Sequence, residues 1–99
     1  MFVDFTAAWC VTCQFNKRTV LTEASVVEAF ENHNVVRLRA DWTRRDPAIT
    51  TELTRLGRSG VPVYALYPPG GGAPRLLSEI LSVDEVRQAL ASSKVAASR

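Results

Sequence analysis

The chain has 99 residues, of which 46% are hydrophobic and 22% are charged, which predicts a single soluble globular domain. Twelve Lys and Arg stand against ten Asp and Glu, and their spread along the chain argues against binding to nucleic acid or an anionic membrane surface. No apolar run approaches the roughly 18 residues that span a bilayer, and the N-terminus lacks a signal-peptide pattern. Because Met1 opens directly on an expected core strand, we expect a domain of a longer protein.

The first elements in chain order are a strand and two helices. Residues 1–7, MFVDFTA, form an apolar run interrupted only by Asp4, which predicts a strand covered on both faces. The pattern turns helical at Cys10, and Thr22 is the expected N-cap of a second helix.

The middle of the chain predicts a second strand and a third helix. Residues 34–40, NVVRLRA, have the composition of a strand. Residues 46–57 have helix signals at both ends, with Asp46 as N-cap, Pro47 at the first helical position and Gly57 just past the end.

The last third predicts two strands and a helix. The strands are expected at 61–67 and 75–81, joined by the loop PPGGGAP. A helix over 82–91 opens with Ser82 and Glu85 at the spacing of a capping box.

The order of these elements predicts an α/β domain. The first strand, helix and second strand form a βαβ unit, and the Gly/Pro loop is short enough to join an antiparallel pair. We therefore expect a mixed four-stranded sheet with helices on both faces, a domain over residues 1–92 and a flexible tail over 93–99.

Cys10 and Cys13, the two cysteines of the chain, are expected to be a redox pair. A structural zinc site needs four ligands, and His33 is the one histidine available, so we expect no metal. A bond between cysteines three positions apart closes a tiny loop and would stabilise the fold little. A strand-to-helix junction in a βαβ unit is instead the setting in which CxxC indicates redox chemistry.

The position of each cysteine indicates its role. Free N–H groups and the dipole at a helix start favour negative charge, so Cys10 is expected to be the exposed, attacking thiolate. Cys13, one turn further and more buried, is expected to resolve the mixed disulfide.

Asp4 is the third expected catalytic residue. A carboxylate in an apolar strand is usually hydrogen-bonded, shifted in pKa or functional. Beneath the cysteines it could exchange the proton that Cys13 must lose or gain, and its charge would raise nearby thiol pKa values. An edge-exposed Asp4 without a role is the alternative.

Pro62 enters the third strand, which often marks a special local geometry. If the Val61–Pro62 bond is cis, the loop could pack against the disulfide and leave the Val61 backbone free to pair with an extended partner. A trans proline at a strand start is more common, and the residues alone leave both open.

Together these residues resemble the thioredoxin superfamily. VDFTAAWCVTC is similar to its active-site strand and helix, with Asp4 at the buried-acid position and Trp9 before the first cysteine, and GVP is similar to its cis-proline loop. The resemblance implies a thioredoxin fold with strand order 2-1-3-4, a cis Pro62, and substrate contacts from Trp9, Val61 and Pro62.

AAWCVTCQFNK, RADWTRRDPAIT and GRSGVPVYALY more closely resemble the C-terminal domain of the DsbD family, including its ScsB-type branch. This implies a monomeric periplasmic domain of an inner-membrane protein with no cofactor beyond the Cys10–Cys13 disulfide. It would relay electrons from a transmembrane domain to periplasmic partners through mixed disulfides. Lys17 is a departure, because some members carry an acidic residue there, and a cation would favour the thiolate.

Two other functions remain as alternatives. One is a free-standing, thioredoxin-like general disulfide reductase. The other is a redox-inert module that binds peptides at the Val61–Pro62 edge, which the intact CxxC argues against. Trp42 is expected to serve packing, and the basic segment 37–45 is expected to be a solvated loop.

Overall fold

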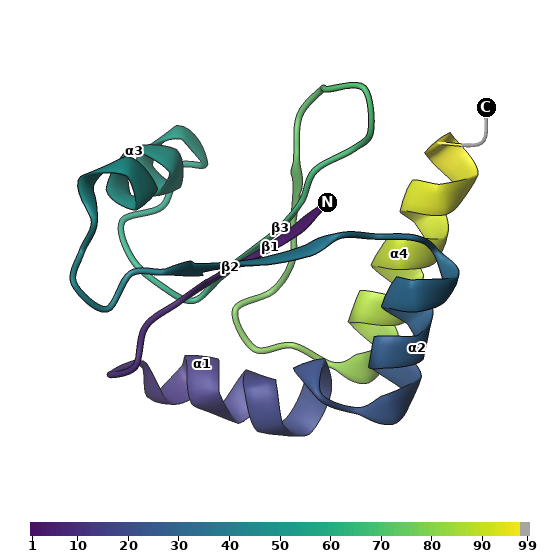
Figure 1. Cartoon of the computed structure of the whole chain (residues 1–99), viewed down its shortest axis with the longest axis horizontal. Coiled ribbons are helices and arrows are strands. Elements are labelled where there is room, and N and C mark those ends of the chain that lie inside the picture. Colours follow the sequence, from purple (N-terminus) through teal and green to yellow (C-terminus); the bar gives the residue numbers. More distant parts are fainter. Residues whose placement is uncertain (98–99) are drawn as a thin grey trace.

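The computed structural model describes the backbone of residues 1–97 and the side chains of residues 1–92. Its centre is a four-stranded sheet in the order β2-β1-β3-β4, as expected (Figure 1). β1 pairs with β2 in parallel and with β3 in antiparallel fashion, and β3 pairs with β4 in antiparallel fashion. The strands are β1 (Phe2–Thr6), β2 (Arg37–Asp41), β3 (Val63–Leu66) and β4 (Arg75–Leu76).

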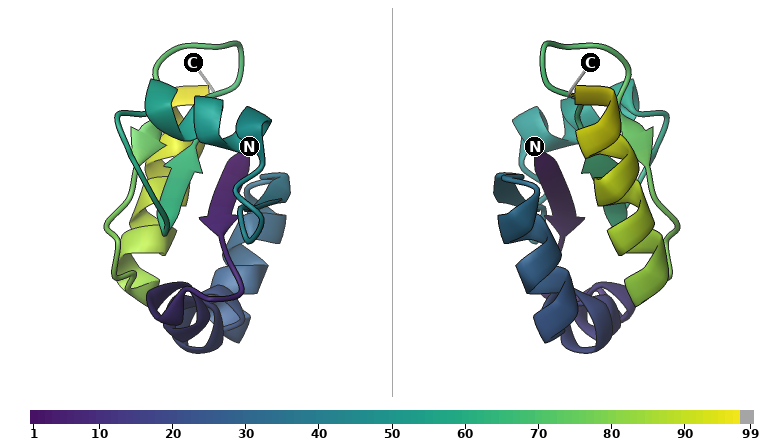
Figure 2. Two further views of the ribbon diagram at one scale, coloured as in Figure 1. Left: turned by 90° about the vertical axis from the view of Figure 1, so that its left-hand side faces the viewer. Right: turned by 90° about the vertical axis from the view of Figure 1, so that its right-hand side faces the viewer.

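The helices cover both faces of the sheet, as Figures 1 and 2 show. α2 and α4 lie side by side against one face, α3 lies against the other, and α1 with its continuation η1 lies across the end where β1 finishes. The segments are α1 (Val11–Asn16), the π-helical η1 (Lys17–Leu21), α2 (Ala24–Asn32), α3 (Pro47–Arg55) and α4 (Val83–Ala97).

The alternation of β1 explains the two halves of the core. Phe2 packs into the half beneath α2 and α4, whereas Val3 and Phe5 point to the α3 side. By the same alternation Asp4 points to the side of Phe2, in register with Arg39 on one neighbouring strand and with Tyr64 on the other.

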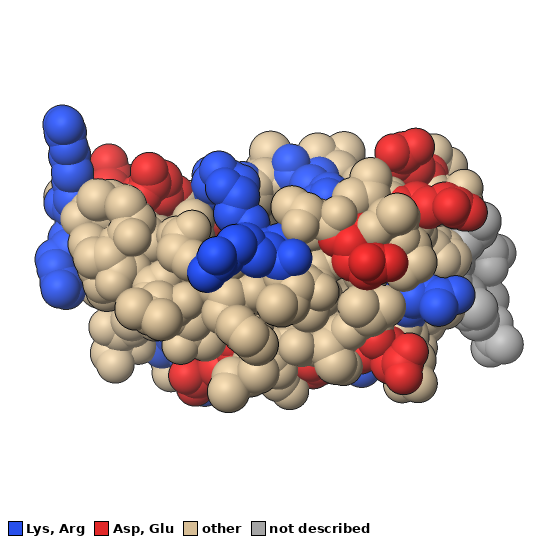
Figure 3. Space-filling model, turned by 90° about the horizontal axis from the view of Figure 1, so that it is seen from below, with Lys and Arg blue, Asp and Glu red and all other residues tan. Residues whose placement is uncertain are grey.

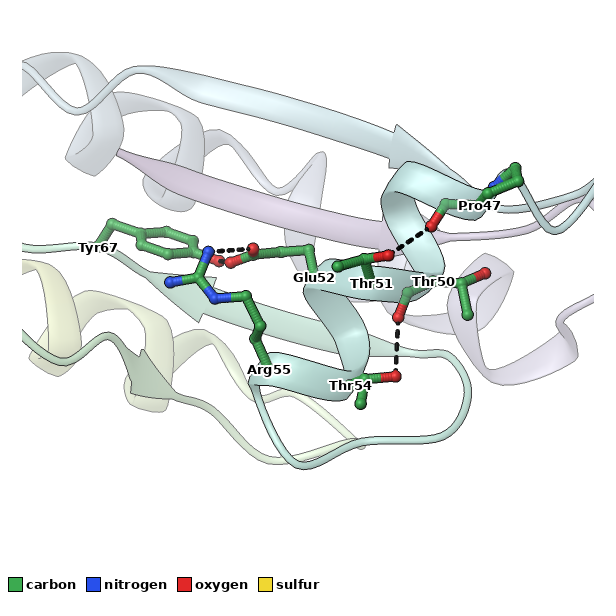
Figure 4. Close-up of polar contacts among 7 residues, drawn as sticks. All are labelled: Pro47, Thr50, Thr51, Glu52, Thr54, Arg55 and Tyr67. Carbon is green, nitrogen blue, oxygen red and sulfur yellow. Dashed lines mark hydrogen bonds and ion pairs between the residues drawn. The ribbon is translucent and has the colours of Figure 1, made fainter.

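α3 confirms the helix signals of its sequence. The Asp46 side chain accepts a hydrogen bond from the Ala48 N–H, Pro47 is the first helical residue, and Gly57 has the positive φ of +75° that a turn past a helix end often needs. Figure 4 shows how the helix is tied to the chain beyond β3: the Tyr67 hydroxyl and Arg55 both bind the Glu52 carboxylate.

Several predicted boundaries are wrong because local turns and hydrogen bonds set them. α2 begins at Ala24 with Glu23 as N-cap, whereas the Thr22 hydroxyl donates to the Lys17 carbonyl and closes η1. β2 begins at Arg37 rather than at residue 34, because Asn34 has a φ of +54° and the Val35 N–H bonds back to Phe30.

The chain after β4 differs most from expectation. β4 ends at Leu76, and the next residues are held by side chains: the Ser78 N–H donates to the Glu85 carboxylate. The Ser82 hydroxyl accepts from the Glu85 N–H, so the capping box is half formed. α4 runs on to Ala97, so the predicted tail over 93–99 overlaps its end, and residues 98–99 lie outside the described residues.

Candidate active site

The end of β1 delivers the two cysteines to the start of α1. They form a disulfide with their Cα atoms 5.2 Å apart. Cys10 is the N-cap of α1, and its sulfur accepts a hydrogen bond of 3.1 Å from the Cys13 N–H. Cys10 is 6% exposed and Cys13 2%, so Cys13 is more buried, as expected, but the expectation of a well-exposed Cys10 is wrong. The surrounding loops enclose both sulfurs.

One of these loops follows β2 and holds the segment before Cys10. The Ala8 N–H donates to the Thr43 hydroxyl oxygen at 2.8 Å, and the Trp9 indole N–H donates to the Thr43 carbonyl at 3.1 Å. Thr43 is in turn fixed by Asp41, whose carboxylate accepts from the Thr43 hydroxyl and N–H, and these bonds lower the pKa of Asp41. Trp9 therefore has a defined place although it is 49% exposed.

Arg45 and Trp42 stack with Trp9, a contact that the sequence did not predict. Trp42 is buried and donates its indole N–H to the Thr50 hydroxyl at 2.8 Å, consistent with the expected packing role. The two indole rings lie 6.0 Å apart, and the Arg45 guanidinium lies 5.1 Å from the Trp9 ring and 4.8 Å from the Trp42 ring. Part of the segment expected to be a solvated loop is thus a structured wall of the site.

The Val61–Pro62 bond is cis, which confirms what the resemblance implied. Val61 packs against a small buried cluster of Ala7, Cys10 and Cys13. The structure therefore brings the loop before β3 against the disulfide, although more than forty-five residues of chain separate them.

Asp4 lies below the disulfide in a partly buried position. Its Oδ1 is buried without a hydrogen-bond partner in the described part of the chain. Loss of hydration on burial raises the pKa of Asp4, and the charges of Arg39, Arg37 and Lys17 oppose that rise. The carboxyl group is consequently easier to protonate than an exposed aspartate.

A hollow of about 240 Å³ joins Asp4 to the second cysteine. Cys13 and Asp4 both line it, and Lys17 and Arg39 place two cations at its wall. The full lining is Asp4, Thr6, Ala7, Ala8, Cys13, Gln14, Lys17, Arg39 and Asp41. Asp4 and Cys13 therefore line the same hollow.

Asn16 anchors the far end of α1, a role that the sequence did not predict. It is fully buried, and its amide N–H groups donate to the Tyr64 hydroxyl at 2.9 Å and to the Glu79 carbonyl at 2.7 Å. Its oxygen accepts from the Leu81 N–H at 3.1 Å. Burial raises the pKa of Tyr64 to about 12, against the effect of the Asn16 bond and with that of Asp4. The neighbouring sequence carries no signal for these partners, which lie 48 to 65 positions away in the chain.

Within residues 1–97, no group of three or more His, Cys, Asp or Glu is placed to hold a metal ion. Over the same residues, no helix combines the length and the apolar character needed to cross a bilayer.

Comparison with known proteins places this geometry in a family. The model of a thioredoxin-like family matches residues 1–69. A curated thiol:disulfide interchange protein, DsbD, of Pseudomonas aeruginosa is 32% identical over 71 residues. That alignment covers 72% of this chain and 12% of the relative, so the chain corresponds to a small part of that protein.

Solved structures show the same fold. The reduced C-terminal domain of DsbD from Neisseria meningitidis superposes with a TM-score of 0.77 at 21% identity, covering 94% of this chain and 79% of that one. A thioredoxin from Thermus thermophilus has a TM-score of 0.75 at 21% identity, with coverages of 97% and 74%. The thioredoxin fold and the resemblance to the DsbD family are confirmed.

Proposed function

The chain belongs to the thioredoxin-like family, and from this premise we propose that it is a thiol–disulfide oxidoreductase domain that relays electrons through Cys10 and Cys13. The observation that carries the proposal is the disulfide itself. It caps the start of α1, with Cys10 as the outer sulfur, beside the cis Val61–Pro62 bond and above Asp4. We take Trp9, Val61 and Pro62 as the residues that contact the partner.

The exchange takes two steps in the reducing direction. The Cys10 thiolate attacks a partner disulfide, forming one mixed disulfide and releasing one partner thiolate, which takes up a proton. Cys13 then loses its proton and attacks the Cys10 sulfur, which releases the second partner thiol. The partner gains two electrons and two protons, and the chain is left with the Cys10–Cys13 disulfide for a dithiol donor to reduce.

Asp4 handles the proton of the second step. Cys13 must be deprotonated to attack, and the Asp4 carboxylate faces it across the shared hollow. A carboxyl with a raised pKa is a better match to a thiol than an exposed aspartate is. Lys17, in the same wall, partly offsets the negative charge that would otherwise oppose a Cys13 thiolate.

We further propose the direction and place of the relay. By its resemblance to the DsbD family, the chain would be a periplasmic domain of an inner-membrane protein, which takes electrons from a transmembrane domain and passes them to periplasmic protein disulfides. Each partner would dock in turn on the face around Cys10, as a transient mixed disulfide. Tethering within one protein raises the effective concentration and allows each contact to be weak. A free-standing general disulfide reductase is the alternative.

An exchange assay separates the two. Stopped-flow tryptophan fluorescence, with Trp9 as the reporter beside the disulfide, would follow reduction of a DsbD-type periplasmic domain and of insulin. We expect fast exchange with the periplasmic domain, slow insulin reduction and slow recycling by thioredoxin reductase. Insulin reduction at the rate of an ordinary thioredoxin, with recycling by thioredoxin reductase, would replace the relay by the general reductase.

A further inference from the structure

Large apolar side chains lie exposed around the buried disulfide. Trp9 is 49% exposed, Phe15 50% and Val11 83%, although the core of the domain is close by. On the continuous α1–η1 helix, Val11 and Phe15 are four residues apart and Arg18 follows three residues later, so the three share one side. Val11 follows Trp9 in the chain with Cys10 alone between them.

Cations border this apolar surface. Figure 3 views the end of the molecule that carries α1 and η1, where Lys and Arg side chains lie across the middle and at one end, with Asp and Glu side chains near several of them. Arg45 lies over the exposed Trp9 ring, and two indoles hold it rather than a carboxylate. Within the described residues, Glu52 and Arg55 form the one ion pair, so the guanidinium donors of Arg45 face no acidic partner.

The geometry of exchange determines what covers this surface. Cys10 is 6% exposed, and a partner sulfur must come within about 2 Å of it to form a bond. The residues that flank the partner cysteine must then lie against the neighbours of Cys10, which are Trp9 and Val11 in the sequence and include Val61 in space. Because the sulfur is buried, the side chains around it contact the partner's flanking residues and can favour some partner sequences over others.

We propose that Trp9, Val11, Phe15, Arg18 and Arg45 form a docking surface for an extended partner segment. This segment carries an apolar side chain on one side of its cysteine, which packs on Val11 and Phe15. It carries a carboxylate on the other side, which binds Arg45. The proposal rests on the exchange function above and adds the chemistry of the partner: apolar contact supplies area, and a planar guanidinium suits bidentate binding of a carboxylate.

Four synthetic peptides test the proposal. Each has one cysteine as a mixed disulfide with thionitrobenzoate, whose release is followed by absorbance. The flanking residues are Leu and Glu, Leu and Lys, Ser and Glu, or Ser and Lys. Every rate constant is divided by the one for hydroxyethyl disulfide with the same protein, which removes changes in thiol reactivity. We expect the Leu/Glu peptide to react about tenfold faster than the Ser/Lys peptide. At low salt, association rates of oppositely charged partners exceed those of like-charged partners by at least this factor.

Two variants assign the preference to its residues. Phe15→Ser should weaken the discrimination of Leu from Ser, and Arg45→Gln should remove that of Glu from Lys. Arg87→Gln, which removes a positive charge from α4, should leave both intact. The Glu preference of the unmodified chain should also shrink at high salt, because screening weakens an exposed ion pair.

The possible outcomes distinguish failure of the docking surface from failure of the thiol–disulfide exchange function. Normal reaction with hydroxyethyl disulfide but equal rates for all four peptides would overturn the docking surface and leave the exchange function standing. No reaction with any disulfide would overturn the exchange function first. A dimer of this chain in sedimentation, abolished by Phe15→Ser, would show that a second copy covers the surface and would likewise overturn the proposal.

Discussion

At the scale of single residues, Asp4 shows how the fold keeps a charge where the sequence pattern calls for an apolar side chain. Its neighbours on β1 are core residues, and its own Oδ1 is buried without a hydrogen bond in the described structure. Arg39, Arg37 and Lys17 reduce the cost of that burial but leave the pKa raised. Residues that are held in an unfavourable state commonly serve function rather than stability.

Replacing Asp4 by Asn should stabilise the oxidised domain at pH 7. A carboxyl with a raised folded-state pKa favours folding while protonated, below its ordinary value of 3.8, and loses that contribution as pH rises through the folded pKa. Urea unfolding from pH 3 to 7 should show the two proteins diverging as pH rises.

The exposed carboxylate of Glu31, changed to Gln, is the control and should show no comparable divergence. An Asp4→Asn protein that is less stable than the parent at pH 7 would mean that the surrounding cations outweigh burial and that the pKa of Asp4 is lowered rather than raised.

At the scale of elements, two connections place the disulfide. The loop after β2 holds the Ala8–Trp9 segment through Thr43. Asn16 holds the other end of α1 to β3 and to the chain before α4. One connection orients the entry to Cys10 and the other fixes the helix that Cys10 caps, so together they set the position of the sulfurs relative to the rest of the molecule.

Changing Thr43 to Val should loosen Trp9 while leaving the fold intact. The side-chain bonds to the Ala8 N–H and to Asp41 are lost, at a cost of about 1 kcal/mol. Acrylamide should then quench the fluorescence of Trp9 more strongly. Trp42 remains buried, so the change can be assigned to Trp9. Thr51→Val removes a hydroxyl bond within α3 and serves as the control. Equal quenching in both variants would argue against a positioning role for Thr43.

Asn16→Ala should be strongly destabilising. The change leaves the Leu81 N–H and the Glu79 carbonyl without their hydrogen-bond partner and opens a void in the core. The combined loss of unfolding free energy should be roughly 2 to 4 kcal/mol. Urea unfolding measures this loss, with the exposed Gln88→Ala as reference. A loss no larger than that of Gln88→Ala would mean that water replaces the amide at little cost.

At the scale of the whole molecule, the fold was more predictable than the site. Local signals such as Pro47 and Gly57 placed α3, and the CxxC between a strand and a helix placed the redox pair, because each acts within a few residues. Strand lengths were overestimated, since pairing across the sheet decides where strands end. Asn16 bonds to a residue 48 positions away and Arg45 stacks on Trp9, and no local pattern encodes such contacts.

The domain boundary at residue 92 also belongs to this scale. The buried residues of α4 that the structure describes are Val86, Ala89 and Leu90, all before that boundary. Residues 93–99, SKVAASR, are mostly small or polar, so we predict that a chain of residues 1–92 unfolds in urea within about 0.5 kcal/mol of the full chain. A loss of several kcal/mol would place residues 93–99 in the domain instead of in a tail.

The most direct test of the central claim, that Cys10 attacks and Cys13 resolves, uses single-cysteine variants. Each reduced variant is mixed with a disulfide-bearing DsbD-type periplasmic domain and examined by intact-mass spectrometry. We predict that Cys13→Ser accumulates a stable mixed disulfide through Cys10. Cys10→Ser should form a mixed disulfide much more slowly, because its remaining thiol, Cys13, is the more buried of the two, at 2% exposed. Faster trapping by Cys10→Ser would reverse the two roles, and trapping by neither variant would contradict the proposed exchange.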